Sequence, residues 1–283
     1  RDMGVPVVGT IHHPITMDKR IDIKHAESLS LKLLKWRWYS FLKMQIKVAR
    51  KLDPIIVVSE NTRKDVVKDF KIDPKKTRKV LHGIDHKTFE PIPSIKRKKN
   101  QLITTASADV PLKGLIYLIR AYSDLLNDFP DLSLIVIGKL RDGPTSKELD
   151  KKGIKDKVKF ISDLTSRQIA ELYAESTIAV SPSVYEGFGF PAGEAMSCGI
   201  PLISTNGGSL PEVVGESGII VPHSNPNELK KAIKELLLSP EKRRELGEKG
   251  RNRVLEKFTW KRAAKELVDV YREAISNADN RSR

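Results

Sequence analysis

Apolar runs and amphipathic stretches alternate regularly along the chain after residue 100. Short runs rich in valine, isoleucine and leucine predict buried strands near residues 102–106, 133–138, 158–161, 177–181, 201–204 and 218–221. Stretches with a helical period predict helices near residues 114–127, 146–153, 166–174, 191–198, 226–238 and 240–256, and a last helix at roughly 260–277. This alternation is typical of an α/β fold, in which helices cover both faces of a parallel sheet and ligands bind at the carboxyl ends of the strands.

The pattern before residue 100 predicts fewer strands. Buried strands are expected at residues 5–11 and 55–59, and a helix at 61–70. Residues from about 24 to 51 predict one long, basic, amphipathic helix, with apolar side chains at helical spacing: Leu31, Leu34, Trp38, Leu42 and Ile46. Two strands are too few for a complete doubly wound lobe. We therefore expect this first lobe to be incomplete, and the chain to be the C-terminal part of a longer protein or a truncated form.

Length and composition suit two lobes of a globular protein. The chain has 283 residues, and its 39% of apolar residues suffices for packed cores. No apolar run has the length of a membrane-spanning helix. The one cysteine, Cys198, has no partner for an internal disulfide, which favours a reducing compartment and hence the cytoplasm.

Positive charge is concentrated in the first lobe. The net charge is +15; residues 1–100 hold 24 lysines and arginines against 11 acids, whereas residues 101–283 hold 27 against 25. Such asymmetry indicates an anionic partner: a membrane surface, a polyanionic acceptor or nucleic acid. The basic helix expected at 24–51 would dock on a membrane surface, although a solvated helix whose apolar stripe packs on its own lobe explains the same residues.

The segment from Glu186 to Glu194 carries the strongest candidate chemistry. A buried strand, a glycine-rich turn and a helix start follow one another there. This order suits phosphate binding, because the first turn of a helix has unpaired N–H groups and the positive end of the helix dipole. The two flanking carboxylates suit the hydroxyl groups of a sugar on one side and of a ribose on the other. A capped helix start with solvated acids explains this segment alone, but not the motifs elsewhere.

Together with those motifs, the segment resembles the retaining glycosyltransferases of the GT-B fold, in particular the large family 4 (glycosyl transferases group 1). The resemblance covers most of residues 5–275. The motifs that carry it are Glu186-Gly187-Phe188-Gly189-Phe190-Pro191-Ala192-Gly193-Glu194, Gly207-Gly208-Ser209-Leu210-Pro211-Glu212, Pro111-Leu112-Lys113-Gly114, Thr10-Ile11-His12 and His82-Gly83-Ile84-Asp85.

The resemblance implies a GT-B fold with two doubly wound parallel-sheet lobes, of which the first is incomplete here. Residues 1–95 would form the C-terminal part of the acceptor-side lobe, and residues 96–258 the Rossmann-like lobe that binds the nucleotide sugar. Residues 259–283 would form a helix that crosses back to the first lobe. Prolines and a run of charges at 91–100 have the composition of a linker.

The resemblance also implies roles for individual residues. Lys113 would contact the diphosphate of the donor, Glu186 its sugar and Glu194 its ribose. His12 would hydrogen-bond the donor sugar near the reacting carbon, although the neighbouring His13 and a purely structural role at a strand end are alternatives. The other expected donor-binding residues are Phe188, Gly189, Phe190, Gly207, Gly208, Gly138 and Leu164.

Two positions depart from the family pattern. Ala108 stands where the family usually has an arginine five positions before the lysine, so either another group substitutes for it or activity is weakened. His82 replaces a usual asparagine. No His, Cys or Asp cluster has metal-ligand spacing, so no metal and no other cofactor is expected. The lysine and the helix N-terminus would neutralise charge instead.

The implied function is transfer of a sugar, with retention, from a UDP- or GDP-sugar to an acceptor hydroxyl by an enzyme of the hexosyltransferase class. The acceptor would be a glycan or a lipid-linked molecule. The alternatives are a nucleotide-sugar epimerase or phosphorylase of the same fold and a non-catalytic nucleotide-sugar-binding module. We expect a cytoplasmic protein, peripheral at the inner face of the membrane if its basic helix docks there. Nucleic acid is a disfavoured partner, because helical spacing assigns some of the aromatic residues to the core.

Overall fold

The chain divides into two compact units in a computed structural model that describes residues 5–106 and 110–282. The larger unit is Ile84–Thr259, and the smaller unit combines Arg1–Gly83 with Trp260–Arg283. Residues 91–100 lie within the larger unit. Among the described residues, no helix combines the length and the apolar character that crossing a bilayer requires.

The larger unit is built on a parallel sheet of six strands in the order β6-β5-β4-β7-β8-β9. The strands are β4 (Gln101–Thr105), β5 (Ser133–Ile137), β6 (Val158–Ile161), β7 (Ile178–Ser181), β8 (Leu202–Thr205) and β9 (Ile219–Val221). All six agree with the strands predicted from the apolar runs to within one residue at either end. The order is that of a dinucleotide-binding Rossmann sheet.

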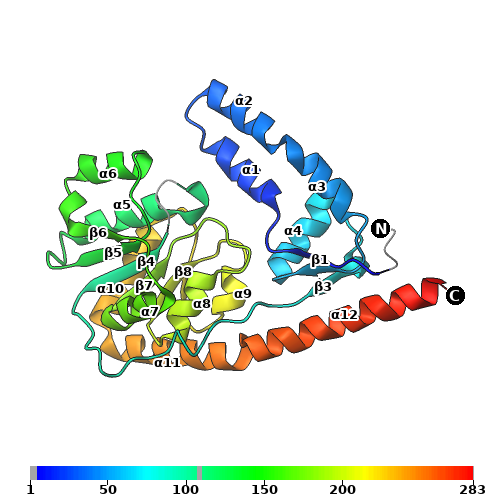
Figure 1. The fold of residues 1–283 in the computed structure, drawn as a ribbon. Coiled ribbons are helices and arrows are strands. Elements are labelled where there is room, and N and C mark those ends of the chain that lie inside the picture. Colours follow the sequence, from blue (N-terminus) through cyan, green and yellow to red (C-terminus); the bar gives the residue numbers. More distant parts are fainter. Residues whose placement is uncertain (1–4, 107–109, 283) are drawn as a thin grey trace. The chain divides into compact units, whose positions relative to one another are not determined.

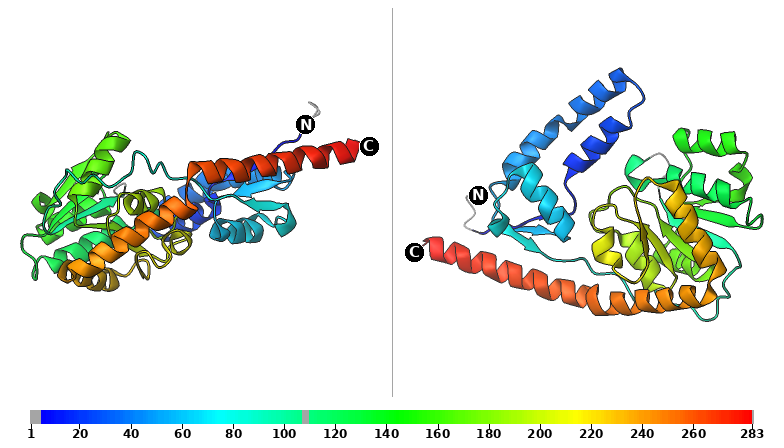
Figure 2. Two further views of the ribbon diagram at one scale, coloured as in Figure 1. Left: turned by 90° about the horizontal axis from the view of Figure 1, so that it is seen from below. Right: turned by 180° about the vertical axis from the view of Figure 1, so that it is seen from behind.

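Helices cover both faces of this sheet (Figures 1 and 2). They are α5 (Leu115–Leu125), α6 (Pro144–Lys152), α7 (Ser166–Glu175), α8 (Phe190–Ser197), α9 (Leu210–Val214), α10 (Pro226–Leu238) and α11 (Pro240–Lys257). Because side chains alternate between the two faces of a strand, Leu102 and Ile178 face the layer of α5 and α10. Ile103 and Ala179 face the opposite layer, with Tyr173 of α7 and Ala195 of α8.

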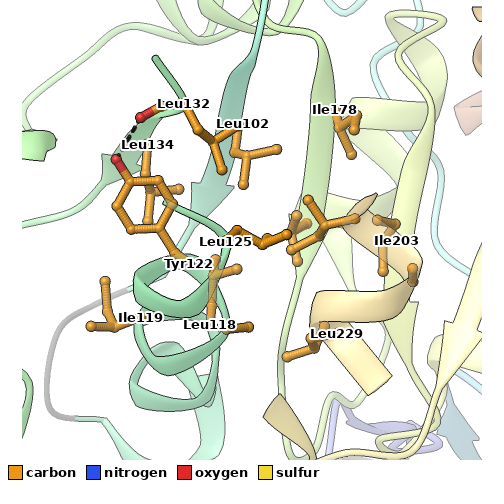
Figure 3. Packing of buried hydrophobic residues seen from close by; sticks show 14 of the residues in the cluster. Leu102, Leu118, Ile119, Tyr122, Leu125, Leu132, Leu134, Ile178, Ile203 and Leu229 are labelled. Carbon is orange, nitrogen blue, oxygen red and sulfur yellow. Dashed lines mark hydrogen bonds between the residues drawn. The ribbon is translucent and has the colours of Figure 1, made fainter. Parts of the chain in front are cut away.

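The main core lies between the sheet and helices α5 and α10 (Figure 3). Leu118, Leu125 and Leu229 are fully buried there, and each such side chain contributes roughly 1.5–3 kcal/mol by leaving water. The buried Tyr122 hydroxyl donates to the carbonyl oxygen of Leu132 at 2.8 Å, so its polar end is satisfied. This packed core makes the sheet a rigid platform for the loops at its edges.

The smaller unit has a parallel sheet of three strands in the order β1-β2-β3. The strands are β1 (Gly9–Ile11), β2 (Ile55–Val57) and β3 (Thr77–Lys79), and the helices are α1 (Ile15–Lys24), α2 (Leu29–Trp38), α3 (Leu42–Ala49), α4 (Glu60–Phe70) and α12 (Trp260–Ser282). Two strands were predicted, and β3 was missed. Only Gly9–Ile11 of the strand expected at 5–11 is formed, with Val5 and Val7 exposed.

The single long helix expected at 24–51 is also wrong. Residues 29–49 form two helices, α2 and α3, with a 3-10 turn at Tyr39–Phe41 between them. The unpredicted helix α1 ends at Lys24, and His25 caps it with a 2.8 Å bond between its Nδ1 and the carbonyl oxygen of Ile21. The chain then turns, and the Ser28 hydroxyl accepts from the N–H of Leu31 to start α2. Helices α1 and α2 lie side by side (Figure 1) and are joined by the Tyr39 hydroxyl, which donates to Asp22 at 2.8 Å.

The apolar stripe expected on that helix is only partly buried. Leu42 is buried, but the side chains of Leu34 and Trp38 are 63% and 73% exposed. Helical spacing therefore indicated helical structure, but neither its breaks nor the face that meets the core.

Candidate active site

The candidate site lies where the strand order of the larger sheet reverses. From β4 the chain proceeds outward to β5 and β6, and it then returns to place β7 on the other side of β4. Ligands of open α/β sheets bind at such a switch point, beyond the carboxyl ends of the strands. Lys113 belongs to a 3-10 turn, Pro111–Lys113, that follows β4, and Glu186 belongs to the loop that follows β7.

The structure brings Lys113 and Glu186 together. The Nζ of Lys113 lies 2.8 Å from Oε1 of Glu186, and the two side chains are 31% and 13% exposed. The hydroxyl of Ser183 donates to the same Oε1 at 2.7 Å. A half-buried ion pair at the switch point thus combines a cation that can face a phosphate with an acceptor that can face a hydroxyl.

Backbone contacts between the loops after β4 and β7 hold this pair in place. The N–H of Val184 donates to the carbonyl oxygen of Leu112 at 2.7 Å. Gly114 has φ +62°, and a Cβ there would lie 2.1 Å from the carbonyl oxygen of Pro182. Only glycine allows this approach, because a larger residue would push the two loops apart.

Gly207 and Gly208 pack against the Glu186 loop from the other side. A Cβ on Gly208, whose φ is +63°, would lie 2.2 Å from the carbonyl oxygen of Glu186, and a Cβ on Gly207 would lie 2.5 Å from that of Ser183. The N–H of Ser209 donates to the carbonyl oxygen of Glu186 at 3.0 Å. The glycine pair therefore supports the Glu186 loop, and the donor contact expected of it remains a prediction.

Helix α8 begins beside the same loop. Gly189, with φ +97°, is its N-cap, and a Cβ there would lie 2.8 Å from Leu210 Cδ2. Phe188 is buried against Phe258, with ring centroids 5.8 Å apart, and packs edge-on against Phe190 at 5.2 Å. These aromatic contacts fix the glycine turn and hence the start of the helix.

Glu194 lies one turn inside α8 and is half-buried. Burial raises the pKa of its carboxyl group to about 7. Among the described residues, no hydrogen bond or ion pair satisfies this carboxyl group. A partly desolvated acceptor of this kind is suited to a ligand that brings its own hydroxyl donors.

Gly138 and Leu164 line one hollow of about 310 Å³ at the carboxyl ends of β5 and β6. Lys139 and Asp163, which also line it, form an ion pair at 3.0 Å. The two residues that sequence analysis assigned to the nucleotide thus lie together in one concave surface.

His12 lies in the smaller unit, at the end of β1. Its ring stacks on that of His82 with centroids 5.1 Å apart, and Nδ1 of His12 lies 3.0 Å from Nε2 of His82. Burial, and then the proximity of His12, lowers the pKa of His82 to about 4. Nε2 of His13 lies 2.6 Å from Oδ2 of Asp18 instead, so the two neighbouring histidines have different contacts.

Ala108 lies outside the described residues. Within residues 5–106 and 110–282, no group of three His, Cys, Asp or Glu side chains is placed to hold a metal ion.

Sequence reasoning missed two supports of the site. Ser183 holds the carboxylate of Glu186, and Gly114 lets the two loops meet. The position of Gly114 directly after Lys113 could have identified it as a support of the site. Nothing in the local sequence distinguishes Ser183 from an ordinary loop serine.

Comparison with known proteins gives matches along most of the chain. Residues 87–253 match the family described as glycosyl transferases group 1, and residues 1–88 match glycosyltransferase family 4. An MMP alpha-(1->4)-mannosyltransferase of Mycolicibacterium hassiacum is 40% identical over 97% of this chain and 67% of its own length. A D-inositol 3-phosphate glycosyltransferase of Streptomyces bingchenggensis is 29% identical over 79% of this chain and 53% of its own length. The chain thus spans between about half and two thirds of these relatives.

Solved structures share the fold. Sucrose-phosphate synthase from Thermosynechococcus elongatus has a TM-score of 0.78 at 23% identity, over 95% of this chain and 68% of its own. Anabaena Alr3699/HepE, in complex with UDP and glucose, has a TM-score of 0.76 at 17% identity, over 93% of this chain and 70% of its own. The fold is that of the GT-B glycosyltransferases, with Rossmann-like lobes. The sequence matches establish that the chain belongs to the glycosyl transferases group 1, a family of sugar-transferring enzymes.

Proposed function

We propose that the protein transfers a sugar from a nucleotide diphosphate sugar to an acceptor hydroxyl, with retention of configuration and without a metal ion. The observation that carries this proposal is the Lys113–Glu186 pair at the strand switch point, beside the glycine-capped start of α8. A cation and a helix N-terminus at one strand edge supply positive charge where a leaving diphosphate develops negative charge.

The pair would rearrange when the donor binds. Lys113 would turn from Glu186 to the diphosphate, and Glu186, still held by Ser183, would accept a hydroxyl of the donor sugar. Glu194 would accept the ribose hydroxyls, and the hollow of Gly138 and Leu164 would hold the base. His12 would hydrogen-bond the donor sugar. In this arrangement the acceptor attacks from the side of the leaving group, and the departing phosphate takes its proton.

The relatives suggest sugars to test as donors. A relative at 40% identity is a mannosyltransferase that forms an alpha linkage, and we extend the same chemistry to this chain: a mannosyl group moved to a glycan or lipid-linked acceptor. Anabaena Alr3699/HepE, which shares the fold, has also been solved in complex with UDP-glucose, so a UDP-sugar is included as a donor beside a GDP-sugar.

The test is transfer from radiolabelled GDP-mannose and UDP-glucose to mannose oligosaccharides by the full-length protein, with the anomeric configuration of the product read by NMR. An alpha-linked product from an alpha-linked donor is expected, and a beta-linked product would overturn retention. Conversion of the donor sugar without an acceptor would identify an epimerase. Donor binding without turnover would identify a non-catalytic binding module.

A second proposal concerns the surface of α2. Leu29, Leu33 and Leu34 are exposed on this helix, together with Trp36 and Trp38, and Lys32, Lys35 and Arg37 are interspersed among them. Basic side chains are attracted to an anionic membrane surface, and exposed leucines and tryptophans beside them can enter its interface. Peripheral docking on such a membrane would bring the enzyme to a lipid-linked acceptor.

A further inference from the structure

A hollow of about 980 Å³ lies at the opposite edge of the six-stranded sheet from the candidate active site. Its lining includes Asn100, Thr177 and Pro201, which directly precede β4, β7 and β8. It therefore lies at the amino ends of the same three strands whose carboxyl ends carry the site described above. We call it the amino-edge hollow.

The lining of the amino-edge hollow is strongly basic. Its cationic side chains are Arg97, Lys98, Lys99, Arg243, Arg244 and Arg251, and its one acidic side chain is Glu248. Lys98 is neutralised by Glu175, whose carboxylate lies 2.6 Å away. Within residues 5–106 and 110–282, none of the other five cations forms an ion pair with a carboxylate.

Neutral carbonyl groups hold three of these arginines in place. Arg97 donates to the carbonyl oxygens of Ser176 at 3.1 Å and of Gly199 at 2.9 Å. Arg243 donates to that of Leu237 at 2.8 Å, and Arg251 to those of Phe89 and Ser197. Carbonyl groups fix a guanidinium without cancelling its charge. Arg97 and Arg243 line the same hollow, so like charges gather there.

We propose that the amino-edge hollow is a binding site for a small anion that carries two or more phosphate groups. Fixed guanidinium groups recognise phosphate oxygens through directed, charge-assisted hydrogen bonds. The hollow has the volume of a small-molecule site, and Pro240 at the start of α11 lines it, which adds the positive end of a helix dipole. The side chains of Lys99 and Arg244 are exposed and form no hydrogen bond among the described residues, so both are available to close on the ligand.

This site would be separate from the donor site. The two edges of the sheet are separated by the length of one strand, and a strand of five residues spans roughly 15 Å. A ligand in the amino-edge hollow therefore leaves Lys113 and Glu186 open to a nucleotide sugar. Binding is measurable without any transferase activity, so its failure and the failure of the proposed function are distinguishable.

The test is calorimetric titration of the protein with sodium tripolyphosphate near neutral pH and at physiological ionic strength. The variant Lys99→Gln/Arg244→Gln is expected to bind at least about tenfold more weakly, because one lost charge-assisted hydrogen bond is worth about a factor of ten in affinity. The matched control is Lys96→Gln/Lys257→Gln, which removes the same charge from exposed side chains of the same two segments outside the hollow. This control is expected to bind like the unmodified protein.

Three further measurements, on Lys113→Gln, with a hexose monophosphate and with phosphatidylglycerol vesicles, decide the source of the phosphate and the location of the site. Lys113→Gln is expected to keep its affinity for tripolyphosphate; loss of binding in this variant would place the anion in the donor site and overturn the proposal. Equal weakening in the control variant would show general charge attraction and would also overturn it. A hexose monophosphate is expected to bind more weakly than tripolyphosphate. Recruitment to phosphatidylglycerol vesicles that Lys99→Gln/Arg244→Gln abolishes, without binding of either soluble phosphate, would assign the hollow to a membrane surface instead and overturn the proposal.

Discussion

Glu194 shows how burial on a short helix can set the pH dependence of ligand binding. Burial raises the pKa of its carboxyl group from an ordinary 4.5 to about 7. The unfolded chain therefore ionises first, and this residue lowers stability as the pH rises from 4.5 through 7. A ribose that donates hydrogen bonds to the carboxylate favours its ionised form, and binding of the ribose would therefore lower the pKa of Glu194.

We predict that donor affinity rises with pH through this range. The ionised fraction of a group with a pKa of about 7 increases about tenfold between about pH 6 and about pH 8, so the dissociation constant of the donor should fall by a similar factor. Calorimetric titration of the nucleotide sugar at both pH values measures it. Glu194→Gln should bind weakly at both values and lose the dependence. If donor affinity of this variant depends on pH as strongly as that of the unmodified protein, another group is responsible for the pH dependence.

Lys113 is predicted to act mainly in the chemical step. Lys113→Ala removes the charge that would stabilise the leaving diphosphate, so kcat should fall by about 10²–10³. Lys231→Ala is the control, because it removes a lysine that pairs with Glu228 at 2.6 Å on the distant helix α10. Steady-state kinetics of the full-length protein should show a normal rate for the control. A rise in KM alone for Lys113→Ala would limit the lysine to ground-state binding.

Elements with a clean period could be predicted from the sequence. The strands of the larger sheet are short runs rich in β-branched residues and leucine, and helices α5, α7 and α10 have marked amphipathic faces, so both kinds of element could be recognised. Strand β3, Thr77-Arg78-Lys79, was missed because it is polar and only three residues long. Helix α1 was missed, and one helix was expected where α2 and α3 form, because helix-forming residues continue through the 3-10 turn at Tyr39–Phe41, while one serine cap decides where α2 begins.

Loops gain their shape from contacts with distant segments, and Gly208 tests this directly. Gly208→Ala would place a Cβ 2.2 Å from the carbonyl oxygen of Glu186 at a φ of +63°, so the Glu186 loop must move. Gly153→Ala is the control, since Gly153 has φ +62° and an added Cβ meets nothing within 4 Å. The control should cost about 1 kcal/mol of unfolding free energy from backbone strain alone.

We predict that Gly208→Ala costs at least about 2 kcal/mol more than this, because backbone atoms must shift as well. Urea denaturation measures both variants, and donor affinity should fall only for Gly208→Ala. Equal losses of stability in the two variants would show that the close approach is unimportant.

At the scale of the whole molecule, motif order located the candidate site better than any local pattern. Lys113 and Glu186 are 73 residues apart, yet each follows a strand of the same sheet, so their meeting at one edge follows from topology. The bond from Ser183 and the stacking of His12 on His82 depend on side-chain placement within loops, which periodicity does not describe. The amino-edge hollow was invisible for a related reason, because its arginines come from two segments about 145 residues apart.

The uneven charge of the molecule leads to the last prediction, which concerns α2. Basic residues near an anionic bilayer contribute about 1 kcal/mol each, and exposed apolar side chains anchor the helix in the interface. The chain should therefore co-sediment with vesicles that contain phosphatidylglycerol, less so as salt is added, and not with neutral vesicles. Leu34→Ser/Trp38→Ser should weaken this binding about tenfold or more, since two large apolar anchors are lost. Leu238→Ser removes a leucine that is 65% exposed on the larger unit and serves as the control. Equal binding by both variants, or equal recovery in the supernatant with neutral and anionic vesicles, would leave α2 as an ordinary solvated helix.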